Sequence, residues 1–325
     1  MARRRSIFSL TKSGRTKSCA VRLVSRTKFR KAEERRKRRG RWTNFLTARE
    51  YAFAEHVASL TRGDVDVSAL PGPNLCLMTR ANNYLLIDVS NSFTKLAFAS
   101  RKRIARPVRV ETARLTSASL GSFVKNHKID KFIVSSVVPK KNREIKKAAG
   151  KTKILWLGAE VNLGVGIDYP APKTIGADRL ANAAAVTELY GWPSIVVDFG
   201  TAVTFDIISA QKKYIGGVIA PGLEAMTSFL YQRTALLPKL SLREPRSALG
   251  RSTIDAMRSG AIFGYRGLVR EILARIKAER FRGRRVRVVA TGGYAHLIAS
   301  RLPEVDAIHP NLTLEGLRIV GNLNP

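Results

Sequence analysis

The stretch IVVDFGTAVTFD, residues 195–206, decides the fold of this chain. Three β-branched residues lead into Asp198, a short Phe-Gly-Thr turn follows, and a second apolar run carries Thr204 and Asp206. Such runs on either side of a tight turn predict the two strands of a hairpin. A carboxylate at the end of the first strand and a hydroxyl in the turn are groups that bind cations and phosphates. The stretch therefore predicts half of a phosphate-binding site.

A second copy of this pattern lies 110 residues earlier, at residues 86–95 with the sequence LIDVSNSFTK. It also reads as strand, tight turn and strand, with an acid at the end of the first strand. An ungapped alignment pairs Asp88 with Asp198, Ser90 with Gly200, Asn91 with Thr201 and Thr94 with Thr204. Two such hairpins facing each other could hold a phosphate chain and its metal from both sides, so the duplication is the main clue to function.

Length and composition limit the class of protein. The 325 residues allow roughly two domains of about 150 residues, and a hydrophobic content of 45% suits a globular core. No apolar run approaches the roughly 20 residues of a membrane span. Both cysteines, Cys19 and Cys76, precede the segment expected to fold, which excludes a disulfide framework there and fits a reducing cytoplasm. Four scattered histidines without cysteine partners argue against structural zinc.

The net charge of +34 is not confined to one end of the chain. Residues 1–77 carry 19 Lys and Arg against 6 Asp and Glu, a balance of +13, which leaves +21 for residues 78–325. One interpretation is nucleic-acid binding through phosphate neutralisation. The other is a basic proteome or a fold that handles anionic substrates such as ATP. The second is favoured, because the basic residues are spread along the core sequence.

Residues 1–77 form a basic extension that includes KAEERRKRRGR at 31–41. No apolar segment follows the charged start, so a secretory signal is not indicated. The basic run fits a solvated helix or an arm that contacts nucleic acid. Alternatively, Met78 resembles an initiator methionine just before the first strand, which would make residues 1–77 a mis-assigned start. We expect this segment to be largely disordered.

From residue 84 onward, apolar strands alternate with helices, which predicts an α/β fold with mixed sheets. The expected strands cover residues 84–89, 95–99, 108–112, 131–138, 154–157, 195–209 (as a hairpin), 214–219 and 285–290. The expected helices cover residues 115–127, 140–149, 174–190, 221–235, 253–277, 294–301 and 311–324. In the alanine-rich helix at 174–190 the buried candidates include Ile175, Leu180, Ala184 and Leu189.

Two further motifs add to the hairpins. ATGGYA at residues 290–295 is a glycine-rich turn between a strand and a helix, suited to packing against a base or ribose, although such a turn is also common without a ligand. GADR at 176–179 places Asp178 in the first turn of a helix. An acid there often serves only the helix dipole, so its role stays open on the residues alone.

The order of DVSNSFT, GADR, DFGTAVTFD, GGVIAPG, ATGGYA and NLTLEGL resembles the type III pantothenate kinases over residues 84–325. That family belongs to the actin, sugar kinase and Hsp70 ATPase superfamily, whose duplicated ribonuclease H-like domains clamp ATP between mixed sheets flanked by helices. The resemblance implies ATP-dependent phosphorylation of pantothenate in coenzyme A biosynthesis. It places one domain at 78–190 and the other at 191–325. It also implies Mg²⁺ with ATP, a monovalent cation (K⁺ or NH₄⁺), and a cytoplasmic homodimer with the substrate site at its interface.

The resemblance also assigns roles to residues. Asp178 is the expected general base for the primary hydroxyl of the substrate, and Asp198 is the expected ligand of the monovalent cation. Arg179 is the natural partner of the substrate carboxylate. The ATP-binding residues would be Asp88, Val89, Ser90, Asn91, Ser92, Phe93, Thr94, Lys95 and Thr201. The pantothenate-binding residues would be Tyr169, Gly176, Ala177, Asp178, Arg179 and Thr253, with Thr253 reaching the substrate bound with the partner subunit.

The first hairpin departs from the family pattern at two positions. The family usually has glycine where this chain has Ser90, and threonine where it has Ser92. Serine in a tight turn requires a negative φ or accepts strain, while the hydroxyl at position 92 is retained, so phosphate binding is expected to survive. A non-catalytic transcriptional regulator built on the same fold is the alternative function. A related sugar or acetate kinase is a third option that GADR disfavours, and neither membrane nor nucleic acid is an expected partner.

Overall fold

The computed structural model describes residues 84–325. The predictions made for the basic extension at 1–77 lie outside the described residues. Within 84–325 the chain alternates strands and helices and builds two mixed sheets, which confirms the predicted α/β fold class. The predicted domain boundary near residue 190 stays a prediction.

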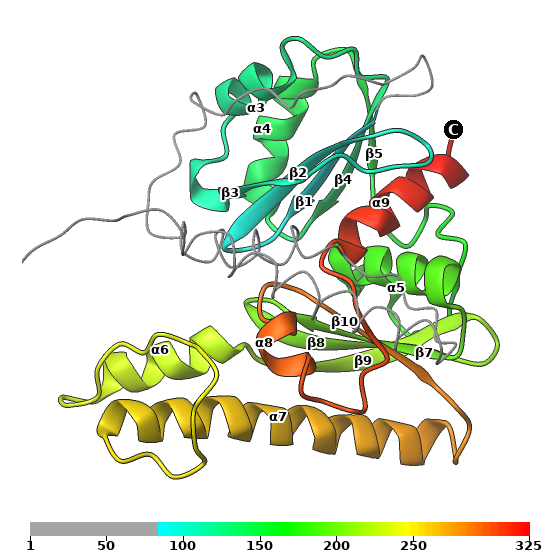
Figure 1. Cartoon of the computed structure of the whole chain (residues 1–325). Helices are drawn as coiled ribbons and strands as arrows, with labels where there is room; N and C mark the ends of the chain where they lie inside the picture. The colour runs from blue at the N-terminus through cyan, green and yellow to red at the C-terminus, as the bar shows by residue number, and fades with distance from the viewer. Residues whose placement is uncertain (1–83) are drawn as a thin grey trace, which may run out of the picture. The chain divides into compact units, whose positions relative to one another are not determined.

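The first sheet has five strands in the order β3-β2-β1-β4-β5 (Figure 1). β1, β2 and β3 form an antiparallel meander, and β4 and β5 continue the sheet in parallel with β1. The strands are β1 (Tyr84–Val89), β2 (Phe93–Ala99), β3 (Val108–Glu111), β4 (Lys131–Ser136) and β5 (Lys153–Trp156). One face packs on the helices α3 (Ser117–Val124) and α4 (Pro139–Ala149), with Leu85, Ile87, Leu120 and Ile145 in a shared core.

The local sequence explains where these two helices begin. Thr116 and Ser119 form a reciprocal capping box at the start of α3, which satisfies two backbone donors that the first turn leaves free. Pro139, expected to end the preceding strand, occupies the first turn of α4. Proline is well tolerated there because that position needs no backbone N–H donor.

The second sheet has six strands in the order β11-β10-β7-β8-β9-β6. β7, β8 and β9 repeat the antiparallel meander of the first sheet, and β10 pairs with β7 in parallel, as β4 does with β1. This shared strand order is the structural counterpart of the sequence repeat. The strands are β6 (Gly166–Ile167), β7 (Ser194–Phe199), β8 (Ala202–Ile208), β9 (Lys213–Pro221), β10 (Arg287–Thr291) and β11 (Ala307–Ile308).

One face of the second sheet packs on the long helix α7. Ile195, Val197 and Phe205 from the sheet meet Ile262 and Leu273 of α7 in a buried core. Although α7 contains three glycines, it runs unbroken, and Ser252 is its N-cap, whose hydroxyl accepts a hydrogen bond from the Asp255 N–H. The helices on this side are α6 (Leu223–Arg233), α7 (Thr253–Arg280) and α8 (Ala295–Ala299).

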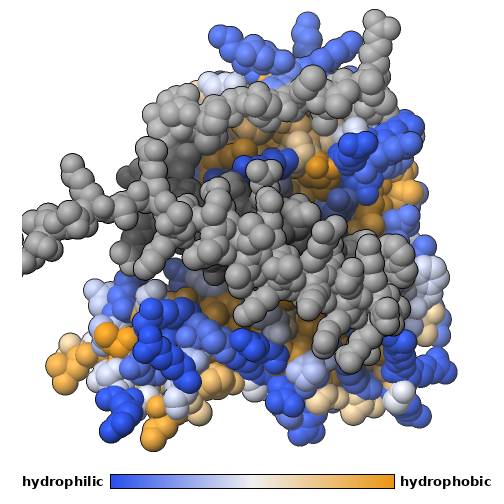
Figure 2. Space-filling view, viewed as in Figure 1, coloured by the Kyte–Doolittle hydropathy of each residue, from blue (hydrophilic) through white to orange (hydrophobic). Residues whose placement is uncertain are grey.

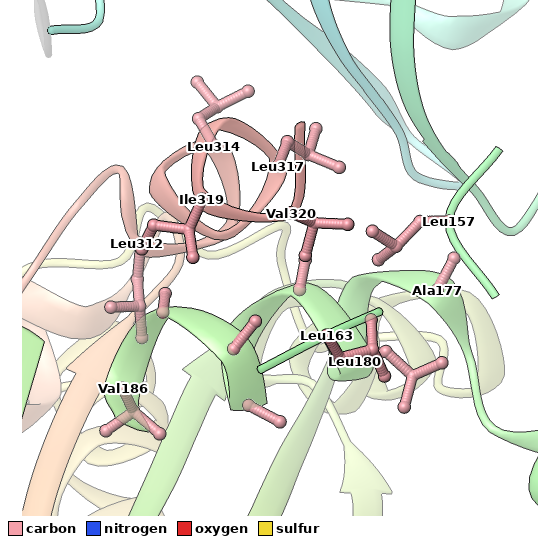
Figure 3. Close-up of a cluster of buried hydrophobic side chains, with 14 of the residues drawn as sticks. Leu157, Leu163, Ala177, Leu180, Val186, Leu312, Leu314, Leu317, Ile319 and Val320 are labelled. Carbon is pink, nitrogen blue, oxygen red and sulfur yellow. The ribbon is translucent and has the colours of Figure 1, made fainter. Parts of the chain in front are cut away.

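Two helices far apart in sequence, α5 (Ala177–Tyr190) and α9 (Leu312–Leu323), lie side by side (Figures 1 and 3). α5 packs on β7 and β8 of the second sheet and also contacts β4 of the first, and α9 packs on β1 and β4 of the first sheet. Figure 3 shows Leu312, Ile319 and Val320 of α9 next to α5, whereas Val186 projects from the other side of α5; all four belong to one buried core with Leu180. The core between these helices therefore joins the two sheets.

The expectation that Leu189 is buried is wrong: 42% of this residue is exposed. Leu180 and Ala184 are buried as expected. Leu189 lies nine residues, or two and a half helical turns, beyond Leu180. It therefore projects from the opposite side of α5, away from the core that α5 shares with α9.

The ungapped alignment of the two hairpins is also wrong after the turn. Asp88 pairs with Lys95 across the first hairpin, whereas Asp198 pairs with Thr204 across the second. The first turn is thus one residue longer than the second, and Lys95, not Thr94, is the counterpart of Thr204. Because side chains alternate between the faces of a strand, Thr94 points away from Asp88, and its hydroxyl bonds with that of Thr112 at 3.0 Å.

None of the helices within residues 84–325 combines the length and apolar character that a bilayer crossing requires.

Candidate active site

Four aspartates act on one another electrostatically where the two sheets and α5 meet. Asp88 lies near the end of β1, Asp198 near the end of β7, Asp206 within β8, and Asp178 in the first turn of α5. Asp178 and Asp198 each raise the pKa of Asp88 and of Asp206, and Asp198 raises that of Asp178. The fold thus gathers carboxylates that stand up to 118 positions apart in the sequence.

Asp88 is the acid of the first hairpin, and it is buried. Burial, opposed by the charge of Lys95 and reinforced by Asp178 and Asp198, raises its pKa to about 7. The nearby Ser135 hydroxyl lowers the pKa of Asp88, yet Asp88 Oδ1 is buried and accepts no hydrogen bond of normal geometry from the described residues. Leaving a buried carboxylate oxygen unpaired is unfavourable, so this oxygen marks a place where a cation or a donor of a ligand would be stabilising.

Asp178 is partly buried at the N-terminal end of α5. Burial and the neighbouring Asp198 raise its pKa, whereas hydrogen bonding from the Arg179 backbone N–H (2.8 Å) lowers it. A carboxylate whose pKa lies above its ordinary value is a better proton acceptor. The position of Asp178 therefore suits a general base as well as a helix cap.

Asp198 is held from two sides. The Nδ2 of Asn182, one turn after Asp178 on α5, donates to Asp198 Oδ2 at 3.1 Å, and the Thr313 hydroxyl of α9 donates to Asn182 Oδ1 at 2.9 Å. On the other side, Gly292 of the TGG turn has φ +93°, and a Cβ there would lie 2.5 Å from Asp198 Oδ1. The glycine turn thus lets the chain pass directly over Asp198.

Arg179 lies next to Asp178 and is anchored in the second sheet. Its Nε donates to Asp206 Oδ1 at 2.6 Å and its Nη2 to the Phe205 carbonyl at 3.3 Å. The side chain of Asp206 is fully buried, and burial, opposed by Arg179, raises its pKa to about 7. The ring of Tyr214 lies 5.7 Å from the guanidinium carbon, and Tyr169 stands edge-on to Tyr214 at 6.2 Å.

The tips of the two hairpins meet. The hydroxyls of Ser92 and Thr201 form a hydrogen bond of 3.0 Å, and both side chains are exposed. Ser90 sits in the turn with its carbonyl accepting from the Thr112 hydroxyl at 2.7 Å. Among the described residues other than glycine, only Lys212 and Arg282 have a positive φ. Serine in place of the family's glycine therefore needs no left-handed conformation.

The remaining predicted site residues differ in placement. Val89 belongs to the core beneath the first sheet, and Asn91 is exposed at the turn. The Arg109 guanidinium stacks on the ring of Phe93 at 3.5 Å. Thr253, the first residue of α7, is exposed. Gly176 and Ala177 lead into α5, so they lie beside Asp178, with Gly176 as the N-cap and Ala177 buried.

The carboxylate oxygens of Asp88 and Asp198 could bind a metal ion whose other ligands are phosphate oxygens and waters. In the described part of the chain no three His, Cys, Asp or Glu residues are arranged to hold a metal ion by themselves. Mg²⁺ in nucleotide sites usually takes only one or two carboxylates, with phosphates and waters completing the shell. The unpaired Oδ1 of Asp88 and the carboxylate of Asp198 suit that arrangement.

Sequence reasoning missed three residues of the site. Asn182 and Thr313 position Asp198, and Asp206 anchors Arg179. The spacing of Asn182, four residues after Asp178 and therefore on the same side of the helix, was the available signal for that residue. Nothing in the sequence indicated that Thr313, near the end of the chain, would reach the site.

Comparisons with known proteins agree on one family. A family model described as type III pantothenate kinase matches residues 84–275. The protein of that name from Akkermansia muciniphila is 49% identical over 243 residues, which cover 74% of this chain and 99% of the relative. The one from Methylacidiphilum infernorum is 41% identical over 239 residues (74% and 88%). The one from Halalkalibacterium halodurans is 37% identical over 253 residues (74% and 99%).

Proposed function

The chain belongs to the type III pantothenate kinase family, and on that premise we propose how its residues carry out the reaction. It is a kinase that transfers a phosphoryl group from ATP to pantothenate, a step of coenzyme A biosynthesis. This family is part of the actin, sugar kinase and Hsp70 ATPase superfamily, and the two sheets with the same strand order agree with that membership. Asp178 is the general base of this transfer.

Asp178 accepts the proton of the primary hydroxyl of pantothenate. The hydroxyl oxygen forms a bond with the γ-phosphorus of ATP, the bond between that phosphorus and the β–γ bridging oxygen breaks, and ADP leaves. An alcohol is a weak nucleophile at neutral pH, so a carboxylate with a raised pKa within reach of its proton speeds the step. The observation that carries this assignment is the raised pKa of Asp178 beside Arg179, whose side chain is anchored to Asp206.

The two hairpins bind the phosphate chain of ATP. The hydroxyls of Ser92 and Thr201 at the hairpin tips are donors for phosphate oxygens, and Lys95 lies opposite Asp88 in the strand register, close to the turn of the first hairpin. Mg²⁺ bound with ATP supplies neutralising positive charge for the phosphates. Asp88 is the residue that would bind this ion, directly or through water, because its buried Oδ1 is unpaired.

Asp198 is the ligand of a monovalent cation, K⁺ or NH₄⁺. Its Oδ2 is oriented by Asn182, which leaves the other oxygen for the ion at the TGG turn. A cation there would offset the charge that Asp198 places on Asp178 and Asp88. Such compensation would favour the ionised form of both acids in the loaded enzyme.

Pantothenate lies against the N-terminal end of α5 in this proposal. Arg179 binds its carboxylate, since a guanidinium forms strong charge-assisted hydrogen bonds with carboxylates. Tyr169 packs beside Tyr214 and is 37% exposed, which leaves its ring available to the substrate. The backbone of Gly176 and Ala177, at the start of α5, lines the same side of the proposed pantothenate site.

A homodimer completes the site by bringing Thr253 of one protomer to the substrate bound with the other. The surface around α6 supports this proposal. Figure 2 shows hydrophobic side chains at the lower left, where Figure 1 places α6. Such exposure of large apolar side chains is typical of a surface that a partner covers. The exposed residues are Met226, Phe229, Leu230 and Tyr231 on α6, and Leu236 and Leu249 in the segment after it.

One assay tests the proposed function. The purified protein with ATP, Mg²⁺ and K⁺ should convert pantothenate to 4′-phosphopantothenate and release ADP only when pantothenate is present. Asp178→Asn should abolish this turnover with the fold retained. Absence of pantothenate-dependent ADP release by the wild-type protein would overturn the proposal in favour of a non-catalytic role on the same fold.

A further inference from the structure

We propose that Asp206 is a positioning residue: it fixes Arg179 side-on, and the pair thereby sets the preference for a substrate that carries a carboxylate. The inference rests on the proposed function, because it takes Arg179 as the group that meets the carboxylate of pantothenate. It goes beyond that function by assigning a role to a buried acid that does not itself reach the substrate.

The hydrogen bonds of Arg179 occupy one edge of its guanidinium. Nε donates to Asp206 Oδ1 at 2.6 Å, and Nη2 donates to the Phe205 carbonyl at 3.3 Å. The group has five N–H donors in a fixed plane. No described residue accepts a hydrogen bond from Nη1. The donors that remain therefore lie together on the far edge, in the fork arrangement that a carboxylate binds with both oxygens.

Asp206 acts through Arg179 because it cannot act directly. Its side chain is fully buried within β8, flanked in the sheet by β7 and β9. The side chain of Arg179 retains 14% exposure, so it connects the buried acid with the surface of the site. A buried carboxylate is unfavourable unless paired. Arg179 is the described cation that bonds to Asp206, through Oδ1, while Asp206 Oδ2 is buried without a hydrogen-bond partner among the described residues.

The opposite strand is shaped to admit the guanidinium. Gly217 of β9 pairs with Asp206, and a Cβ at Gly217 would overlap both the Phe205 carbonyl oxygen of β8 and Arg179 Nη2. Any side chain at this position would therefore disturb the pairing of β8 with β9 as well as the guanidinium. Tyr214 completes the setting, since its hydroxyl donates to Asp206 Oδ1 at 3.4 Å and its ring flanks the guanidinium. The guanidinium of Arg179 is therefore held in one orientation by Asp206, Gly217 and Tyr214.

The direct test compares Asp206→Asn with the wild-type enzyme on two substrates. The first is pantothenate, and the second is pantothenol, which carries a hydroxyl in place of the carboxylate. With the side-on bond weakened, we expect the KM for pantothenate to rise about 10- to 100-fold. The kcat for pantothenate and the kinetics with pantothenol should change less than about threefold, so that the preference for pantothenate is lost. A purely structural role would impair both substrates alike.

A double-mutant cycle tests whether Asp206 works through Arg179. Arg179→Gln should raise the KM for pantothenate on its own, and adding Asp206→Asn should raise it no further, since the two residues act as one unit. Multiplying effects on KM would overturn the inference. So would a wild-type KM in the Asp206→Asn enzyme.

A second variant keeps the inference testable if Asp206→Asn does not fold. Arg179→Lys retains a charge to pair with Asp206 but lacks the planar fork. It should lose the preference for pantothenate over pantothenol, and a retained preference would overturn the proposal. Asp306→Asn is the matched control, because it breaks an Asp–Arg pair with Arg287 elsewhere in the second sheet. Absence of wild-type turnover of pantothenate would instead overturn the proposed function, and this inference with it.

Discussion

The hydroxyl oxygens of Ser92 and Thr201 lie 3.0 Å apart, although 109 residues separate them in the sequence. Each sits at the tip of one of the two repeated hairpins, so this hydrogen bond closes the pair of hairpins across the proposed phosphate site. Phosphate oxygens bound between the tips would replace this contact with stronger bonds to a charged acceptor. The two hydroxyls proposed as donors to ATP are thus held next to each other by the contact between the hairpin tips.

Replacing Ser92 with alanine should weaken ATP binding. One hydroxyl donor to a charged oxygen is lost, which corresponds to roughly a 5- to 30-fold rise in the KM for ATP after allowance for the internal bond. The KM for pantothenate should change little. Steady-state kinetics with ATP varied at saturating pantothenate measures the effect. Ser92→Thr, which restores the family's residue and keeps the hydroxyl, should stay within about threefold of wild type; equal KM values for all three proteins would contradict the role of Ser92.

Replacing Asp178 with asparagine should lower kcat by about 10²- to 10⁴-fold, the usual contribution of a general base. The shape of the side chain is kept, so the thermal unfolding temperature and the binding of ATP should be close to wild type. Single-turnover measurement of phosphopantothenate formation separates the chemical step from binding. A kcat within threefold of wild type would remove Asp178 from the mechanism.

Replacing Asp88 with asparagine should stabilise the protein free of nucleotide and metal at pH 8. The pKa of Asp88 is raised to about 7, so the folded state retains a proton that the unfolded chain releases near pH 4. Wild-type stability should therefore fall as pH rises from about 4 to 7, and stay level above that as far as this group is concerned. Asparagine carries no charge to bury, and we expect about 1–3 kcal/mol more stability at pH 8.

Denaturant unfolding at pH 5 and pH 8 measures this effect. The gain from Asp88→Asn should be small at pH 5 and larger at pH 8, whereas turnover should be lost at both. A gain of the same size at both pH values would show that the charge of Asp88 is not its cause.

Replacing Thr313 with valine should weaken the binding of K⁺ and leave the KM values for ATP and pantothenate unchanged. The Thr313 hydroxyl orients Asn182, and Asn182 in turn orients Asp198. Without it the buried Asn182 oxygen is unpaired, which costs about 1–3 kcal/mol. We expect the K⁺ concentration for half-maximal activity to rise about 3- to 10-fold. Thr313→Ser, which retains the hydroxyl, is the control. An unchanged K⁺ titration in the valine variant would exclude this route of positioning.

Replacing Phe229 with glutamate should dissociate the proposed homodimer. Phe229 is 58% exposed on α6 among other apolar side chains, and a charge there cannot be buried against a second copy without a partner. Light scattering after size-exclusion chromatography should give the mass of a monomer, and pantothenate turnover should fall because Thr253 no longer reaches the other protomer. A wild-type protein that is monomeric and active would contradict the dimer.

Much of the fold follows from sequence pattern. Each hairpin strand is a run of β-branched and apolar residues, and glycine, proline or serine marks its turns. What the pattern did not resolve is register. The one-residue difference between the two turns, which sets Lys95 and not Thr94 opposite Asp88, depends on how the chain crosses from strand to strand. The exposure of Leu189 likewise depends on which side of α5 finds a partner.

The residues of the candidate site likewise fall into those that the sequence predicts and those that it does not. GADR and the two aspartate hairpins are short, local motifs, so the sequence reveals Asp88, Asp178 and Asp198. Asp206 was visible as an acid in an apolar strand, but its role depends on Arg179 reaching across from α5. Thr313 lies 131 residues from Asn182. Contacts of that range arise from tertiary packing, and a single sequence carries no local signal for them.

The packing of α9 on β1 and β4 has a consequence for how the protein is made on the ribosome. One face of the first sheet is only partly covered, by α5 on β4, until α9 has been synthesised, more than 200 residues after β1. Contacts of such long range slow folding and prolong the exposure of apolar strands. Nascent chains halted before residue 312 should therefore engage chaperones through this face, and release of the C-terminus should be the event that frees them.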